Sequence, residues 1–155
     1  MLQLAEAREG GIIEFVAFLA GGQSFCIEII QIREIRRWTP VTMLPHSPDF
    51  VLGVINLRGA VIPIYDLAAK LGLGRIDPSE RHVIIIAAVE SQTVGLLVDS
   101  VSEILSISSD VVQDTPDVQQ DQAIQCIQGV IPVEGGMTRV IDLAQVVPSP
   151  VEAMN

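Results

Sequence analysis

The fold is decided by the stretch Gly53-Val-Ile-Asn-Leu-Arg-Gly-Ala-Val-Ile-Pro-Ile-Tyr-Asp-Leu67, in which two apolar runs flank an Arg-Gly pair. Each run, 54–57 and 60–64, has the length and composition of a β-strand. The pair Arg58-Gly59 suits a tight turn, because glycine adopts backbone conformations that other residues avoid. The stretch therefore predicts a β-hairpin with Arg58 at its tip.

A short helix is predicted directly after this hairpin. Asp66 is a good N-cap residue, and Gly72 suits the position just past the end of a helix. The hairpin and the helix together form one compact supersecondary unit.

Much of this unit recurs in the chain. Gly129 to Leu143 aligns with Gly53 to Leu67 at an offset of 76 positions, and Phe15 to Ile35 aligns with Ile84 to Ile104 at an offset of 69. The identical pairs include Gly53/Gly129, Gly59/Gly135, Asp66/Asp142, Glu34/Glu103 and Ile35/Ile104. One plan used twice predicts a pair of similar small β-subdomains, since two copies are too few for a solenoid.

Composition places the chain among globular proteins. It has 155 residues, of which 49% are hydrophobic, with a mean hydropathy of +0.47, enough apolar material for one domain or two small ones sharing a core. Many short strand-like runs, Gly and Pro turns and almost no long helical pattern predict an all-β architecture of small barrels or a sandwich.

Charge, cysteine content and hydropathy exclude several classes of protein. A net charge of −10 argues against nucleic-acid binding, which needs clustered Lys and Arg. Cys26 and Cys126 lie in apolar runs and are predicted to be buried, unreactive thiols. No signal peptide is recognised, and the longest apolar run, Val83 to Val89, has the length of a strand, so we expect a cytoplasmic protein without direct membrane insertion.

The charges are unevenly distributed. Four arginines, Arg33, Arg36, Arg37 and Arg58, lie in the first repeat, whereas no Lys or Arg occurs between Arg81 and Arg139. A protein with one more basic end and one acidic end is suited to binding two different protein partners.

Candidate catalytic residues are few. Asp66 and Asp142 occupy equivalent positions in the two repeats, as the paired carboxylates of a small aspartyl hydrolase would. The alternative is that each caps a helix, and then Asn should replace either at little cost. His46 and His82 stand alone without other ligands at metal spacing, so neither a metal site nor a cofactor site is predicted.

The motif Gly53-Val-Ile-Asn-Leu-Arg-Gly59 followed by Val61-Ile-Pro-Ile-Tyr-Asp-Leu67 closely resembles the signature of the CheW family of chemotaxis coupling proteins. The resemblance extends over roughly 14–147 and includes Ile32-Arg-Glu-Ile35, Val94-Gly-Leu-Leu-Val-Asp-Ser-Val101 and Ile104-Leu-Ser-Ile107. It implies two intertwined SH3-like five-stranded β-barrels with a few short helices. We accordingly expect a CheW-like domain over 12–147, with repeats at about 14–72 and 83–147 and flexible termini at 1–11 and 148–155.

The same resemblance implies a non-enzymatic adaptor that couples the cytoplasmic tip of a chemoreceptor to the regulatory domain of a histidine kinase, associated with the membrane through the receptor. It also implies that Glu34 pairs with Arg58. The expected partner-binding residues lie along the groove between the barrels and are Ile32, Glu34, Ile35, Gly53, Asn56, Arg58, Gly59 and Val98. Two alternatives are the hydrolase and a stand-alone regulatory β-barrel module outside chemotaxis.

Overall fold

The structure is a computed structural model that describes residues 11–115 and 125–147. The expected flexible termini lie outside the described residues, apart from Gly11. Within the described ranges the elements run in the order β1 (Ile12–Ala20), β2 (Gln23–Glu28), the 3-10 helix η1 (Ile29–Gln31), β3 (Ile32–Arg37), β4 (Val51–Leu57), β5 (Ala60–Asp66), α2 (Leu67–Lys70), β6 (Val83–Val89), β7 (Gln92–Val98), β8 (Ser100–Ser108), the 3-10 helix η2 (Ser109–Val111), β9 (Ile127–Val133), β10 (Gly136–Ile141) and α4 (Leu143–Val146).

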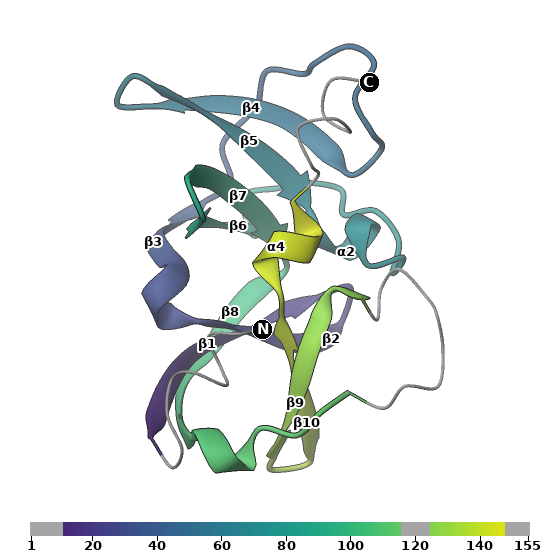
Figure 1. Cartoon of the computed structure of the whole chain (residues 1–155). Coiled ribbons are helices and arrows are strands. Elements are labelled where there is room, and N and C mark those ends of the chain that lie inside the picture. The colour runs from purple at the N-terminus through teal and green to yellow at the C-terminus, as the bar shows by residue number, and fades with distance from the viewer. Residues whose placement is uncertain (1–10, 116–124, 148–155) are drawn as a thin grey trace.

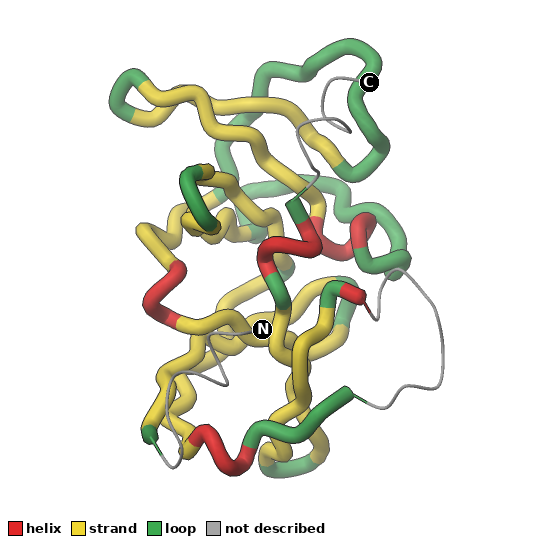
Figure 2. Tube along the Cα trace, in the orientation of Figure 1, coloured by secondary structure: helices red, strands yellow, loops and turns green. Residues whose placement is uncertain are grey.

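The strands form two five-stranded sheets, which confirms the all-β prediction (Figures 1 and 2). One sheet, sheet A, has the order β8-β1-β2-β10-β9, and the other, sheet B, has the order β3-β6-β7-β5-β4. Sheet A thus combines the hairpin β1–β2 of the first repeat with β8, β9 and β10 of the second repeat. Sheet B combines the hairpin β6–β7 of the second repeat with β3, β4 and β5 of the first. Parallel pairs join the exchanged hairpins to their sheets, β2 with β10 and β5 with β7. The two barrels are therefore intertwined.

Alternate residues of the central strands enter two different cores. In β6, Ile84 and Ile86 belong to the apolar cluster inside the barrel formed by sheet B. Ile85 and Ala87 belong to another cluster, which is shared by the two sheets. Sheet A has its own inner cluster, which includes Phe15 of β1. Because both faces of these strands are buried, their sequences are continuous apolar runs rather than alternating ones.

The two short helices lie against the shared core, and both begin as predicted. The Asp66 carboxylate accepts a hydrogen bond from the Ala69 N–H at 3.1 Å, and the Asp142 carboxylate accepts one from the Ala144 N–H at 3.2 Å. Helix α2 ends at Lys70 with Leu71 as its C-cap, and the next residue, Gly72, has a φ of 76° and makes the left-handed turn past the helix end that the sequence predicted.

The repeated glycines Gly53 and Gly129 allow a second backbone segment to lie against their strands. A Cβ atom on Gly53 would lie 2.4 Å from the carbonyl oxygen of Thr42, and one on Gly129 would lie 3.0 Å from that of Gln113. Thr42 forms a bridge to the residue after Gly53, and Gln113 to the residue after Gly129. The same contact is thus built in each barrel, which explains why both repeats have glycine there.

Both cysteines are buried, as predicted. Burial raises the pKa of the Cys26 thiol to about 12, and burial also raises the pKa of Cys126. Neither thiol forms appreciable thiolate at neutral pH, so both serve as small core residues. Among the described residues, no helix is long and apolar enough to cross a membrane.

Substituting alanine for Gly53 should destabilise the fold by about 2 kcal/mol or more, because its φ of 151° disfavours a side chain and the new Cβ would meet backbone rather than a mobile side chain. Gly136→Ala is the matched control, since nothing lies within 4 Å of a Cβ built there. Urea unfolding of both variants checks this. Equal midpoints would contradict the proposed role of the close backbone contact.

Candidate protein-interaction surface

The tip of the β4–β5 hairpin is a two-residue turn formed by Arg58 and Gly59. Arg58 and Gly59 have φ values of 51° and 89°, the pattern of a type I′ turn, whose twist matches that of the flanking strands. The Asn56 side-chain oxygen accepts a hydrogen bond from the Gly59 N–H at 3.0 Å. Arg58 therefore lies at the tip of the hairpin, as the sequence predicted.

An ion pair joins the two edges of sheet B. Arg58 Nη2 lies 2.6 Å from Glu34 Oε1, and Arg36 Nη1 lies 3.4 Å from Glu34 Oε2. Glu34 belongs to β3 and Arg58 follows β4, and these strands are the opposite edges of the sheet. The hydrogen bond from Arg58 is the main reason that the pKa of Glu34 is lowered.

The other expected site residues divide into exposed and buried groups. Ile35 is 43% exposed and Ile32 is half-buried, both on the edge strand that carries Glu34. Val98, by contrast, is fully buried in the shared core, and Gly53 is buried beneath Thr42. These two residues shape the barrels from within and present no side chain to a partner, so the exposed surface comprises Ile32, Glu34, Ile35, Asn56, Arg58 and Gly59.

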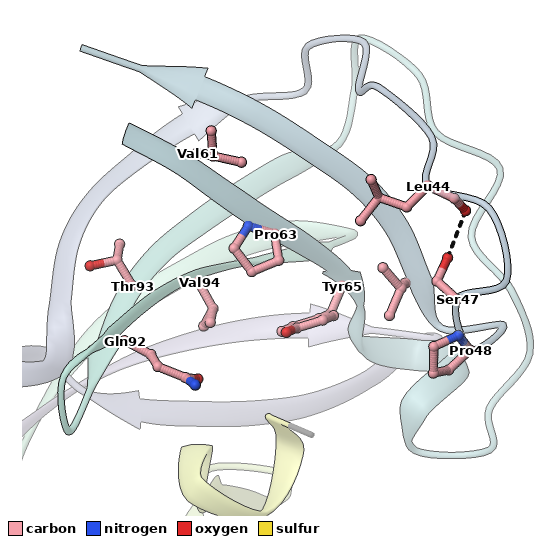
Figure 3. Close-up of a pocket in the computed structure, with 10 residues that line it drawn as sticks. Leu44, Ser47, Pro48, Val61, Pro63, Tyr65, Gln92, Thr93 and Val94 are labelled. Carbon is pink, nitrogen blue, oxygen red and sulfur yellow. Dashed lines mark hydrogen bonds between the residues drawn. The ribbon is translucent and has the colours of Figure 1, made fainter. Parts of the chain in front are cut away.

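An apolar pocket of about 410 Å³ lies on the same hairpin, between β5, β7 and the loop before β4 (Figure 3). Val61, Pro63 and Tyr65 are alternate residues of β5 and line its floor. The loop that covers one side is held by a hydrogen bond from the Ser47 hydroxyl to the Leu44 carbonyl at 2.9 Å. The remaining apolar lining includes Leu44, Val51 and Val94.

A second groove, of about 610 Å³, lies between the two sheets and is more polar. It is lined from sheet B and η1 by residues that include Ile30, Arg33 and Glu90, and from β9 and the start of α4 by Gln128, Asp142 and Leu143. A groove between the barrels is what the family resemblance implied. Its described lining nevertheless contains none of the eight expected site residues.

The sequence prediction did not include the pocket residues, although a signal for them exists. Strand β5 is apolar on both of its faces, with Ile62 and Ile64 directed into the barrel and Val61, Pro63 and Tyr65 directed away from it. An outward face that is apolar in a short strand indicates a surface that another segment or partner covers.

Comparison with known proteins agrees with this geometry. The model of the CheW-like domain matches residues 14–151. The chain is 49% identical over 149 residues to the chemotaxis protein CheW of Rhizobium meliloti, covering 96% of both proteins, and 31% identical over 136 residues to that of Klebsiella aerogenes, covering 88% of this chain and 82% of the relative. The scaffolding protein TtCheW from Thermoanaerobacter tengcongensis has the same fold, with a TM-score of 0.83 at 27% identity over 93% of each chain.

The chain belongs to the CheW family. It is accordingly a non-enzymatic adaptor of chemotaxis-type signalling, and neither the hydrolase nor the stand-alone module finds support. The CheW fold also accounts for the paired aspartates, because each begins a short helix in the equivalent position of the two barrels.

The two caps differ in one respect that the sequence did not predict. Both carboxylate oxygens of Asp66 accept backbone hydrogen bonds, the second from the Ile76 N–H at 2.7 Å, and the residue is buried. Asn offers one acceptor oxygen instead of two, so it can cap the helix but leaves the Ile76 N–H without its partner. Burial raises the pKa of Asp66, which means that an uncharged Asn avoids part of a desolvation cost.

We therefore expect Asp66→Asn to lower the free energy of unfolding by about 1 kcal/mol, the net of a lost hydrogen bond and a relieved charge. Asp142→Asn should change it by less than about 0.5 kcal/mol, because its one described side-chain bond is an N-cap that Asn makes equally well. Urea unfolding at pH 7 compares the two. Equal losses would show that the bond to Ile76 contributes nothing.

Proposed function

We propose that this protein couples the cytoplasmic tip of a chemoreceptor to the regulatory domain of a histidine kinase, acting in the cytoplasm beside the receptor complex. Membership of the CheW family supports the adaptor role. The resemblance of its sequence motifs to that family supports these two classes of partner.

The receptor-binding surface in this proposal is the exposed edge of sheet B. The observation that carries it is Arg58, whose side chain is 75% exposed yet is held by Glu34 and by a turn that Asn56 stabilises. A guanidinium that is already ordered loses little conformational entropy when a partner binds. Ile35 and the apolar pocket beside Val61 would then supply hydrophobic contacts for an amphipathic helix of the receptor.

A role in binding, rather than in folding, also suits the energetics of the ion pair. Exposed ion pairs contribute little to stability, because water screens them and two long side chains must be ordered. At an interface, truncation of an arginine commonly costs about 2 kcal/mol or more. The two roles can therefore be separated by experiment.

Arg58→Ala should weaken binding of a receptor tip by about 30-fold or more, the ratio that corresponds to about 2 kcal/mol, while the melting temperature stays unchanged within error. Isothermal titration and thermal unfolding measure the two effects. Arg75→Ala is the matched control, because Arg75 is also exposed and paired with a carboxylate, that of Asp49 at 3.2 Å, on the connection after α2.

Native affinity of Arg58→Ala for the receptor tip would overturn the proposed receptor-binding surface. An equal loss of affinity in Arg75→Ala would show a non-specific effect of charge. Early unfolding of Arg58→Ala would assign the ion pair to the fold instead.

A further inference from the structure

The apolar pocket beside β5 has a counterpart in the other barrel, where the same place is filled. In sheet A the parallel strands β10 and β2 place Val140 opposite Cys26. In sheet B the parallel strands β5 and β7 place Ile64 opposite Gly95. The two pairs are related by the repeat offsets of 76 and 69 positions, so the strands have the same register and equivalent residues can be compared one by one.

In sheet A an aromatic ring and a long side chain occupy this place. Phe25 is buried, and the guanidinium of Arg139 lies over its ring, 5.6 Å from the ring centre, and donates a hydrogen bond to the Ser24 carbonyl at 3.3 Å. The equivalent residues in sheet B are Val94 and Pro63, which are both smaller. The ring and the side chain that covers it are therefore both missing in sheet B, where a pocket of about 410 Å³ remains.

The Tyr65 hydroxyl in this pocket has no partner within the described part of the chain. Tyr65 is 6% exposed, and no hydrogen bond joins its hydroxyl to another described residue. Figure 3 shows its ring at the floor of the pocket, with the hydroxyl on the side of Gln92 and Val94. Burial raises the pKa of Tyr65, so the hydroxyl keeps its proton at neutral pH and can donate a hydrogen bond as well as accept one. Since buried tyrosine hydroxyls usually have a partner, this one indicates a ligand with a polar atom facing it.

The lining restricts the chemistry of such a ligand. No charged side chain lines the pocket among the described residues, so a bound carboxylate, phosphate or ammonium group would lose its water without gaining a partner. Leu44, Val61 and Val94 offer apolar contacts, and the Tyr65 ring can pair with another aromatic ring. Val94 is only 1% exposed, so the pocket reaches below the surface that the flat face of a partner helix covers. A pocket of a few hundred Å³ with these properties is typical of small-molecule sites.

We propose that this pocket binds a neutral aromatic small molecule of one or two rings that carries one hydrogen-bonding group. Its ring takes the place that Phe25 fills in sheet A, and its polar group bonds to the Tyr65 hydroxyl. The ligand occupies space that the proposed function gives to apolar side chains of a receptor, so a bound ligand excludes those side chains from the pocket. Binding of the small molecule itself concerns the pocket alone and does not depend on whether a receptor binds there.

Titration of the full chain with 2-naphthol at pH 7 tests this site. This probe has two fused aromatic rings and one hydroxyl group, and it is uncharged at neutral pH. It should bind one-to-one with a dissociation constant of about 1 mM or tighter, as expected for a ligand of this size. The largest changes in the amide resonances should occur at Tyr65 and from Gln92 to Val94. The saturated counterpart 2-decalinol should bind about threefold more weakly or worse, because it cannot form an aromatic pair with Tyr65.

Variants of the pocket make the test specific. Tyr65→Phe should weaken binding about fivefold, the effect of one lost hydrogen bond. Val94→Phe and Pro63→Arg each introduce the residue type of sheet A and should weaken binding about tenfold or more, because the new side chain fills the pocket. Pro63 is only half-buried, so its replacement tests the same point if Val94→Phe does not fold. Met137→Phe is the matched control, since it adds the same ring at an exposed position of sheet A, and thermal unfolding establishes that each variant folds.

Absence of saturable 2-naphthol binding to the wild-type chain would overturn the inference. So would unchanged affinity in folded Tyr65→Phe and Pro63→Arg, which would place the bound probe elsewhere, or equal affinity for 2-decalinol, which would remove the aromatic class. A chain that binds a receptor tip through Arg58 but does not bind 2-naphthol would refute this inference and leave the proposed function standing. A chain that binds 2-naphthol in the pocket but no receptor tip would do the reverse.

Discussion

The apolar layer shared by the two sheets is the constraint on which the rest of the structure depends. Central strands such as β6 bury one face inside their own barrel and the other against the opposite barrel, and burying a side chain such as Ile85 contributes about 1.5–3 kcal/mol. Because each hairpin completes the sheet of the other repeat, neither repeat can form a full sheet by itself. The hairpin exchange and the shared core therefore require both halves to be folded together.

At some equivalent positions of the two barrels the fold requires one type of residue, whereas at others it allows different side chains. Gly53 and Gly129 are kept alike because another backbone segment lies against each, and Asp66 and Asp142 because each begins a helix. Arg58 and Glu134 occupy equivalent places at exposed tips, where a change of side chain costs little. The two barrels consequently share a scaffold while their tips carry opposite charges, and loops held on a rigid scaffold are where binding properties diverge.

Features governed by neighbouring residues could be predicted from the sequence: the Arg58-Gly59 turn, the aspartate caps and the buried cysteines. The exchange of hairpins could not be read from residue patterns and came only from the family resemblance, because apolar periodicity does not specify which strand pairs with which. Val98 belongs to a continuous apolar run, and only the structure shows that its face is covered by the second barrel. The hydrogen bond from the Ile76 N–H to Asp66 also could not be predicted from the sequence, because Ile76 lies ten residues further along an irregular connection.

The ion pair between Glu34 and Arg58 is sensitive to ionic strength but not to pH in the neutral range. Arg58 lowers the pKa of Glu34 from an ordinary value of 4.5, so the carboxylate stays ionised throughout the neutral range and the ion pair is present wherever the cell operates. Because the pKa of Glu34 is lower in the folded protein than in the unfolded chain, the ion pair stabilises the fold at pH values above the unfolded pKa. This stabilisation is lost only as the pH falls through the lower pKa of the folded state. Salt, in contrast, screens exposed charges at every pH. The exposed charges at the tip of the β4–β5 hairpin therefore keep the same sign and position throughout the neutral pH range, on a framework that is otherwise repeated in the second barrel.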